Sequence, residues 1–157
     1  HGIEVVCEYE DVPPILAHPA KLQQVWTNLI VNAAEAIEDE EADLKAQGQE
    51  GAASEKKLPA RGHAEARITI TVANSGDGVE VCVCDNGPGI SPQVLERIME
   101  PHFTTKAGRV RFGLGMGMSI VHSIIADLGG QLTIDSHPGS TIMRILLPLH
   151  HVHEEES

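Results

Sequence analysis

The chain has 157 residues, of which 41% are hydrophobic, and a formal net charge of −12. This length suits one globular domain with a single core. The acidic balance argues against general nucleic-acid binding and against contact with anionic membranes, because both need a basic face. No segment is apolar enough to cross a membrane and no signal-peptide pattern opens the chain, so we expect a cytoplasmic domain.

The three cysteines do not indicate a metal or disulfide framework. Cys82 and Cys84 are spaced C-x-C within a strand-like segment, which is neither a zinc pattern nor an even set of half-cystines. We expect reduced structural thiols.

The first expected elements are a short strand over residues 3–9 and a helix that begins near His18 or Pro19. On a helical wheel the apolar residues of this helix occupy one arc, and Asn28, Asn32 and Glu35 lie along its border. The helix is therefore predicted to bury one face and to present three polar groups beside it.

Residues 38–66 are rich in Glu, Asp, Ala, Gln, Gly and Lys and contain almost no large apolar residue. Such a composition cannot bury enough surface to offset the entropy of ordering, so we expect an extended or partly helical insert that is mostly mobile. A solvated acidic helix over residues 39–47 is the alternative, because Ala, Glu, Leu and Lys favour helix. The insert is expected to act as a spacer, with partner docking as the alternative.

Two strands are predicted over residues 67–72 and 79–85, and turn-forming residues 74–78 between them indicate an antiparallel hairpin. Ser91 then precedes a proline, which is typical of a helix N-terminus, and this helix is expected to run to about Met99.

Helical periodicity returns over residues 118–128 and meets a glycine pair. The last two strands are predicted over residues 131–135 and 141–147, with a turn at 136–139 between them. The predicted fold class is α+β: a two-layer α/β sandwich with a mixed, mostly antiparallel sheet of about five strands and about three helices on one face.

Four motifs occur in a fixed order along this sequence, and together they predict a pocket for Mg-ATP. They are Asn28-x-x-x-Asn32, Asp85-Asn86-Gly87-Pro88-Gly89, Phe103-Thr104-Thr105-Lys106 and Gly113-Leu114-Gly115-Met116-Gly117. Each motif alone is weak, because each has a common structural explanation.

The asparagine pair is a candidate metal site. Mg²⁺ prefers hard oxygen ligands and shares them with phosphates, so the Asn32 amide oxygen is the first candidate ligand, and Asn28 one turn earlier could assist or orient a water. For the pair alone, two polar residues that face solvent are the more common explanation.

Asp85 follows a strand with alternating valines, and the glycines after it permit close backbone approach to a flat ligand. Its carboxylate could accept a hydrogen bond from an exocyclic amine such as that of adenine. The alternative is an ordinary Asx turn at the end of a strand.

The run from Gly113 to Gly117 opens a helix, where free N–H groups and the helix dipole favour phosphate. Lys106, Arg109 and Arg111 precede it and could reach the β and γ phosphates, although a solvated basic loop is the alternative. The run is neither a Walker A loop nor a clear dinucleotide fingerprint.

The ordered motifs resemble the catalytic ATP-binding domain of sensor histidine kinases, within the gyrase, Hsp90, histidine kinase and MutL ATPase superfamily and its Bergerat-type ATP-binding fold. The resemblance covers nearly the whole chain. The first motif looks like the family's N box, the second with Ile90 its G1 box, residues 100–106 its F box, and residues 113–121 its G2 box.

The resemblance implies that Asn32 coordinates Mg²⁺ with Asn28 beside it, that Asp85 binds adenine, and that residues 101–112 form an ATP lid. Catalytic roles are implied for Asn32, Lys106, Arg109 and Arg111. Nucleotide contacts are implied for Asn28, Asn32, Asp85, Gly87, Gly89, Ile90, Phe103, Thr104, Thr105, Lys106, Gly113, Leu114, Gly115, Met116, Gly117, Met118 and, with an altered motif around it, Thr141.

Two departures from the superfamily patterns carry information. Hydrolytic members place a water-activating Glu four residues before the metal Asn, where this chain has Asn28, so a kinase is favoured over an autonomous ATPase. Many kinases have a basic residue where this chain has Glu35, so phosphate contact is expected to rest on the lid bases. A non-catalytic nucleotide sensor and a hydrolytic ATPase remain the alternatives.

None of the nine histidines lies in the sequence context of a kinase phosphoacceptor. We therefore expect an ATP-binding domain over residues 1–149 with a polar tail over 150–157, as a fragment of a larger kinase. The resemblance implies two partners, a helical dimerisation and phosphoacceptor domain and a response-regulator receiver domain. The isolated domain is expected to be a monomer.

Overall fold

The structure is a computed structural model that describes residues 2–49, 57–100 and 117–149. The predicted lid, the predicted site residues from Phe103 to Met116 and the polar tail all lie outside these residues.

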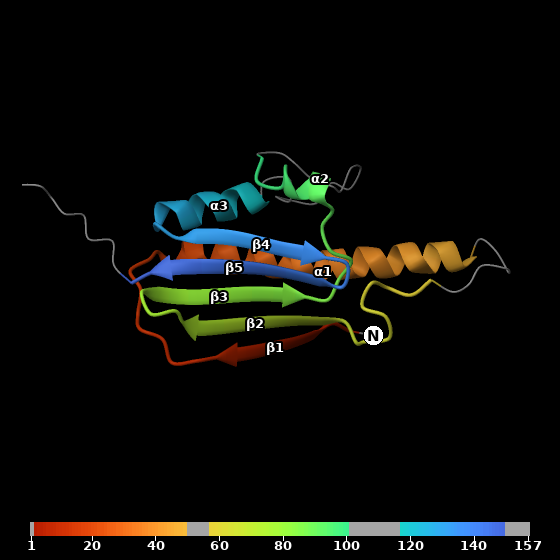
Figure 1. The fold of residues 1–157 in the computed structure, drawn as a ribbon, viewed down its shortest axis with the longest axis horizontal. Helices are drawn as coiled ribbons and strands as arrows, with labels where there is room; N and C mark the ends of the chain where they lie inside the picture. The colour runs from red at the N-terminus through yellow and green to blue at the C-terminus, as the bar shows by residue number, and fades with distance from the viewer. Residues whose placement is uncertain (1, 50–56, 101–116, 150–157) are drawn as a thin grey trace, which may run out of the picture.

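One mixed sheet of five strands forms the frame of the described chain (Figure 1). In chain order the strands are β1 (Glu4–Tyr9), β2 (Arg67–Asn74), β3 (Gly78–Asp85), β4 (Gln131–His137) and β5 (Ser140–Pro148). Their order across the sheet is β1-β2-β3-β5-β4, and only the β1–β2 pair is parallel. The predicted mixed, mostly antiparallel sheet is confirmed.

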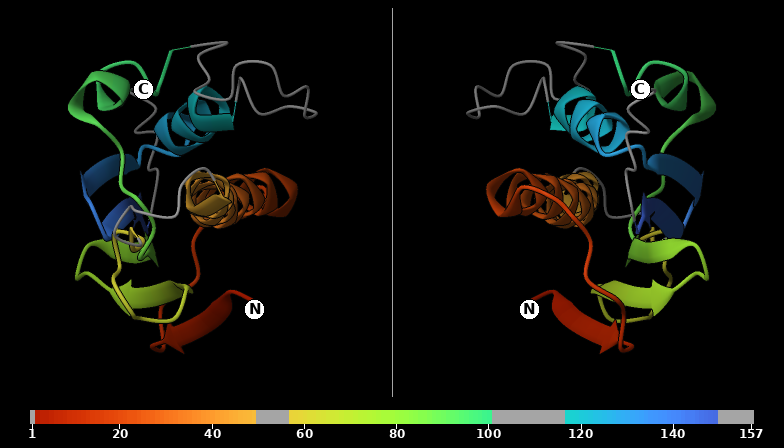
Figure 2. Two further views of the ribbon diagram at one scale, coloured as in Figure 1. Left: turned by 90° about the vertical axis from the view of Figure 1, so that its right-hand side faces the viewer. Right: turned by 90° about the vertical axis from the view of Figure 1, so that its left-hand side faces the viewer.

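Two long helices cover one face of this sheet, and α1 (Pro19–Gln49) lies beside α3 (Gly117–Asp127) in both side views (Figure 2). The short α2 (Pro92–Leu95) lies beyond the β4 edge of the sheet (Figures 1 and 2). The predicted two-layer α/β sandwich is confirmed, with α1 and α3 as its helical layer.

The core lies between the two layers. Its most deeply buried side chains come from α1, α3 and the inner face of the sheet, and they are Val25, Leu29, Ile37, Ile68, Val121, Ile125, Ile145 and Leu147. Aliphatic side chains thus fill the interior, as a composition with only 3% aromatic residues requires.

The predicted hairpin between β2 and β3 is antiparallel, with Ile70 opposite Val83. Its turn is closed by two hydrogen bonds: Ser75 N donates to the Gly78 carbonyl at 3.0 Å, and Gly76 N donates to Asn74 Oδ1 at 3.0 Å. Asn74 therefore supplies the local acceptor that its residue type predicts for a turn.

The acidic insert begins with a helix that continues α1. Residues 38–49 continue α1, so the alternative of a helix at the start of the insert is confirmed. Residues 57–66 return along α1, where the guanidinium of Arg61 forms ion pairs with Glu40 and Glu41. Apart from Ala66, which is buried in the core, charged and polar contacts hold this segment on α1. A hydrophobic pattern could not have predicted these contacts.

The helix after Ser91 is shorter than predicted. Ser91 is its N-cap as expected, with its hydroxyl accepting from Val94 N at 3.4 Å, but α2 ends at Leu95 and not near Met99. The following residues form tighter turns, in which Arg97 N donates to Val94 O and Glu100 N donates to Arg97 O. These i to i−3 bonds replace the α-helical pattern.

Candidate functional site

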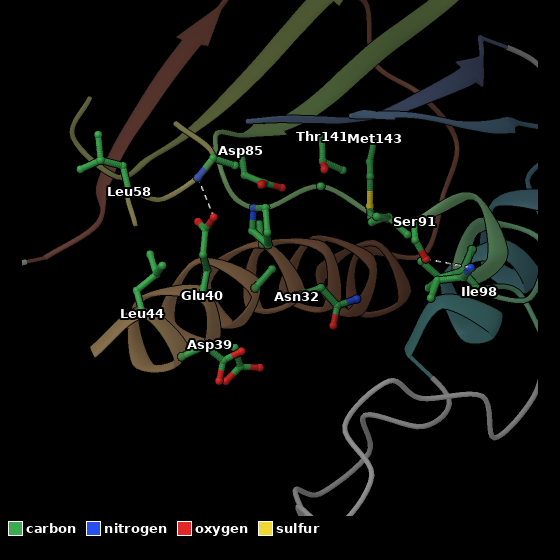
Figure 3. A pocket seen from close by; sticks show the side chains of 18 of the residues that line it. Asn32, Asp39, Glu40, Leu44, Leu58, Asp85, Ser91, Ile98, Thr141 and Met143 are labelled. Carbon is green, nitrogen blue, oxygen red and sulfur yellow. Dashed lines mark hydrogen bonds between the residues drawn. The ribbon is translucent and has the colours of Figure 1, made fainter. Parts of the chain in front are cut away.

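A cavity of about 660 Å³ lies between α1 and the ends of β3 and β5 (Figure 3). This size is within the range of small-molecule and cofactor sites. Six of its lining residues were predicted from the sequence to contact nucleotide, and they are Asn32, Asp85, Gly89, Ile90, Met118 and Thr141. The N box, the G1 box and the start of the G2 helix thus meet at one cavity.

The N-box asparagines lie against the first residue of α3. Asn28 Nδ2 donates to the Gly117 carbonyl oxygen at 3.4 Å. A Cβ placed on Gly117 would lie 3.9 Å from both Asn28 Cγ and Asn32 Nδ2. The spacing of four residues on α1 therefore aims two amides at the helix terminus predicted to bind phosphate.

This geometry also gives Asn28 a structural role. An amide can donate to a carbonyl, whereas a carboxylate at the same position could not. The predicted difference from hydrolytic members thus coincides with a contact that requires a donor.

Glu35, the third polar residue on the border of α1, is buried with 7% of its surface exposed. The sequence placed it correctly on the helix but did not predict its burial. The helical wheel gives the direction of a side chain and not the depth of the neighbours around it.

Asp85 is the last residue of β3, and its side chain points from the sheet toward α1 (Figure 3). One carboxylate oxygen, Oδ1, accepts from Gly87 N at 2.9 Å. Burial raises the pKa of Asp85 above its ordinary value, while the hydrogen bond from Gly87 opposes this shift. The Asx turn considered from the sequence is therefore present, on a carboxylate that also lines the cavity.

A side chain at Gly87 would crowd two neighbouring side chains. A Cβ at this position would lie 2.8 Å from Asp85 Oδ1 and 3.2 Å from Ile37 Cγ1. Any larger residue here would have to displace the Asp85 carboxylate and the Ile37 side chain, so glycine suits the close approach of this loop to α1.

Gly89 is held in the left-handed region at φ 82°. A Cβ here would approach the His137 carbonyl oxygen to 2.6 Å, because the loop packs on the turn between β4 and β5. Gly139 of that turn donates its N–H to the Gly87 carbonyl at 3.0 Å. The G1 loop is thus fixed by a second glycine turn, which belongs to the altered motif near Thr141.

Ile90 N donates to Ser136 Oγ at 2.8 Å, and this hydroxyl lies 2.7 Å from Thr141 Oγ1. Thr141 is 3% exposed and points from β5 into the cavity wall (Figure 3). The sequence predicted a weak role for Thr141 and none for Ser136. Only the β4–β5 pairing, which places these two residues opposite each other, brings them together.

The sequence missed the outer part of the cavity. Ala36, Glu40 and Leu44 of α1 line it together with Leu58 and Ala60 of the returning segment. These residues lie in or next to the stretch whose composition indicated a spacer. The spacing of four residues places Ala36, Glu40 and Leu44 on one side of the helix, but the charged Glu40 interrupts any apolar pattern, so no sequence signal indicates a cavity wall.

The arrangement is suited to a ligand with a flat polar base and an anionic end. A desolvated carboxylate at one point of the cavity can bind an amine, and two amides at the N-terminus of α3 lie where an anion and its metal would be stabilised. The donor chemistry fits Mg²⁺, because one amide oxygen suffices when phosphates and waters supply the remaining ligands.

A protein-family model described as "Histidine kinase-, DNA gyrase B-, and HSP90-like ATPase" matches residues 17–151. Sensory histidine kinase/phosphatase NtrB of Rhizobium meliloti is 35% identical over 141 residues, which cover 87% of this chain and 32% of NtrB. Sensor histidine kinase ZraS of Escherichia coli strain K12 is 35% identical over 130 residues, which cover 83% of this chain and 22% of ZraS. The chain thus spans a third or less of the length of these two relatives.

Solved structures show the same fold. The catalytic domain of histidine kinase ThkA, in a nucleotide-free form, gives a TM-score of 0.67 at 26% identity and covers 94% of this chain and 79% of its own. Full-length ShkA in complex with AMPPNP gives a TM-score of 0.67 at 24% identity, covering 96% of this chain and 26% of ShkA, a likeness of fold alone.

The chain belongs to the histidine kinase, DNA gyrase B and Hsp90-like ATPase family, and it corresponds to the catalytic domain of sensor histidine kinases. The predicted resemblance is therefore confirmed. Within residues 2–49, 57–100 and 117–149, no helix has the length and apolar character needed to cross a membrane.

Proposed function

We propose that this chain binds Mg-ATP and transfers the γ-phosphoryl group to a histidine on a separate helical dimerisation and phosphoacceptor domain. The observation that carries the proposal is the cavity itself, which joins Asp85 and Asn32 from two distant motifs next to the N-terminus of α3. Family membership supports the same activity.

In this proposal the exocyclic amine of adenine donates a hydrogen bond to Asp85 Oδ2, because Oδ1 already accepts from Gly87 N. The glycines at 87 and 89 let the loop approach the base closely. Asn32 supplies an oxygen ligand to Mg²⁺, and backbone N–H groups at the start of α3 bind phosphate. When bound, Mg²⁺ would neutralise charge on the phosphates.

The proposed transfer is a direct displacement. A neutral imidazole nitrogen of the acceptor forms a bond to the γ-phosphorus while the bond to the β–γ bridging oxygen breaks, and ADP leaves with that electron pair. Asn28 cannot act as a general base toward water, and its amide is directed to the Gly117 carbonyl. The phosphoryl group is therefore retained until the acceptor histidine arrives.

The lid bases Lys106, Arg109 and Arg111 are proposed to contact the β and γ phosphates, and a receiver domain is proposed as the later acceptor of the phosphoryl group. We place the domain in the cytoplasm, where ATP and such receivers are found.

The test is transfer of γ-labelled phosphate from ATP to the helical domain of the parent protein, supplied as a separate chain. We expect labelled acceptor and very slow phosphate release by the catalytic chain alone. Calorimetric binding of ATP without any transfer would refute the kinase proposal, and rapid release of phosphate without acceptor would favour a hydrolase.

A further inference from the structure

We propose that Arg61 is a positioning residue for nucleotide binding, and that the segment from Lys57 to Ala66, here called the strap, forms the outer wall of the adenine end of the cavity. The proposal rests on the proposed function. It assigns a role to the insert, which has no part in the four motifs.

Ion pairs and hydrogen bonds hold the strap on α1. The Arg61 side chain is 7% exposed, and its guanidinium pairs with Glu40 at 3.3 Å and with Glu41. Its Nε also donates to the Ala64 carbonyl at 3.2 Å, and Ala60 N donates to Glu40 Oε1 at 2.7 Å. A buried charge is costly when a partner is removed, so undocking is opposed by the whole set of bonds.

The docked strap lines the same cavity as Asp85 and Asn32. Leu58 from the strap lies across the outer end of the cavity from Glu40 and Leu44 of α1 (Figure 3), and Ala60 also lines the cavity. Leu58 is 44% exposed although it lines the cavity. A ligand in the cavity would cover part of this surface and gain from its burial.

A chain of backbone contacts links the strap to Asp85, the carboxylate proposed to bind adenine. The Ala60 carbonyl oxygen lies 3.0 Å from where a Cβ of Gly139 would stand. Gly139 N donates to the Gly87 carbonyl at 3.0 Å, and Gly87 N donates to Asp85 at 2.9 Å. Loss of the Arg61 contacts would therefore loosen both the outer wall and the backing of the G1 loop.

We expect the strap to affect binding of the base and not of the phosphates. The strap and the G1 loop line the cavity near Asp85, whereas Asn32 of α1 lies near Gly117 at the start of α3. Releasing the strap should therefore weaken adenosine and ATP binding by the same factor and leave inorganic tripolyphosphate binding unchanged.

The experiment compares Arg61→Met, Arg61→Lys and Glu40→Gln with the unmodified chain by calorimetry, using ATP, GTP, adenosine and tripolyphosphate. Arg144→Met is the matched control, because Arg144 pairs with Glu80 at 3.5 Å and is exposed outside the cavity. We expect Arg61→Met to reduce ATP and adenosine affinity by about fivefold or more and to lower the ATP-to-GTP preference. Arg61→Lys should retain part of the affinity, since it keeps the positive charge but loses the planar guanidinium that pairs with two carboxylates at once.

Glu40→Gln keeps the shape of its side chain and decides the matter if Arg61→Met does not fold in a thermal melt. The proposal would be overturned if every folded variant among Arg61→Met and Glu40→Gln bound ATP within twofold of the unmodified chain. An equal loss of affinity for tripolyphosphate would also overturn it. A second readout is reciprocal: ATP should slow hydrogen exchange at the Ala60 amide in the unmodified chain. Failure of the unmodified chain to bind ATP would instead overturn the proposed function.

Discussion

The hydroxyl oxygens of Ser136 and Thr141 lie 2.7 Å apart across the β4–β5 pair, and Ser136 also accepts the backbone N–H of Ile90. A sheet hairpin thereby holds the G1 loop through one side chain. Thr141 is 3% exposed, so replacing Ser136 would leave a buried hydroxyl short of a partner. Replacing Thr141 would leave the half-buried Ser136 hydroxyl with the bond from Ile90 N.

Replacing Thr141 by valine keeps the shape of the side chain and removes this bond. We expect the free energy of unfolding to fall by about 1–3 kcal/mol, measured by urea denaturation. Thr133→Val, at an exposed position on β4, is the matched control and should change stability by less than about 0.5 kcal/mol. Equal stability of the two variants would show that the hydroxyl pair contributes nothing.

Alanine substitutions at Gly76 and Gly89, which have nearly the same φ, distinguish the cost of backbone strain from the cost of a steric clash. Gly76 has φ 85° and no atom within 4 Å of a Cβ, whereas Gly89 has φ 82° and a Cβ would lie 2.6 Å from a carbonyl oxygen. We expect Gly76→Ala to cost about 1–2 kcal/mol of unfolding free energy, the price of the left-handed conformation. Gly89→Ala should cost about 1–3 kcal/mol more, because the backbone must also move. Similar thermal melts for both variants would contradict the packing of the G1 loop on the β4–β5 turn.

The raised pKa of Asp85 predicts opposite pH effects on folding and on binding. Without ligand, the buried ionised carboxylate opposes folding. Its contribution to stability is therefore most favourable below the unfolded pKa of 3.8 and declines as pH rises through the folded value. Asp85→Asn should thus gain stability relative to the unmodified chain as pH rises across this window, as measured by denaturation at several pH values.

Adenine binding needs the ionised form, so ATP affinity should fall as pH is lowered through the raised pKa of Asp85. Asp85→Asn should bind ATP weakly, and this part of the pH dependence should be absent. Asp77→Asn removes an exposed carboxylate from the β2–β3 turn and is the control. If Asp85→Asn followed the same affinity profile as the unmodified chain, another group would be responsible.

Asn32→Ala tests the metal assignment. We expect the affinity for Mg-ATP to fall by about tenfold or more, equivalent to about 1.4 kcal/mol, because an oxygen ligand is lost. In EDTA the two proteins should bind ATP with similar affinity. The exposed amide Gln24 on α1 provides the control variant Gln24→Ala. An Asn32→Ala defect of the same size with and without Mg²⁺ would exclude metal coordination by this residue.

Strands and caps were predictable because local residues determine them. The alternating Val79, Val81 and Val83 are all buried on β3, and Ser91 is the N-cap of α2. The turn with Gly139 was likewise expected from its residue types. In each case a period of two or a capping side chain acts within a few positions of the chain.

The docked strap could not be predicted in the same way. Residues 38–49 have no apolar stripe, so their helix was only the alternative, and Arg61 pairs with carboxylates 20 and 21 positions earlier. Ser136 had no motif to mark it. Charged and hydroxyl pairs of this kind depend on tertiary approach, which neither hydrophobic period nor composition encodes.

The parallel pairing of β1 with β2 means that the chain from Glu10 to Ala66 is a single crossover connection. The entropy of closing a connection rises only logarithmically, so doubling its length costs about 0.6 kcal/mol. Added residues in this crossover leave the strand order and register untouched. Lengthening α1 and adding the strap therefore costs little free energy, and it brings a segment of the crossover to the wall of the cavity that holds Asp85.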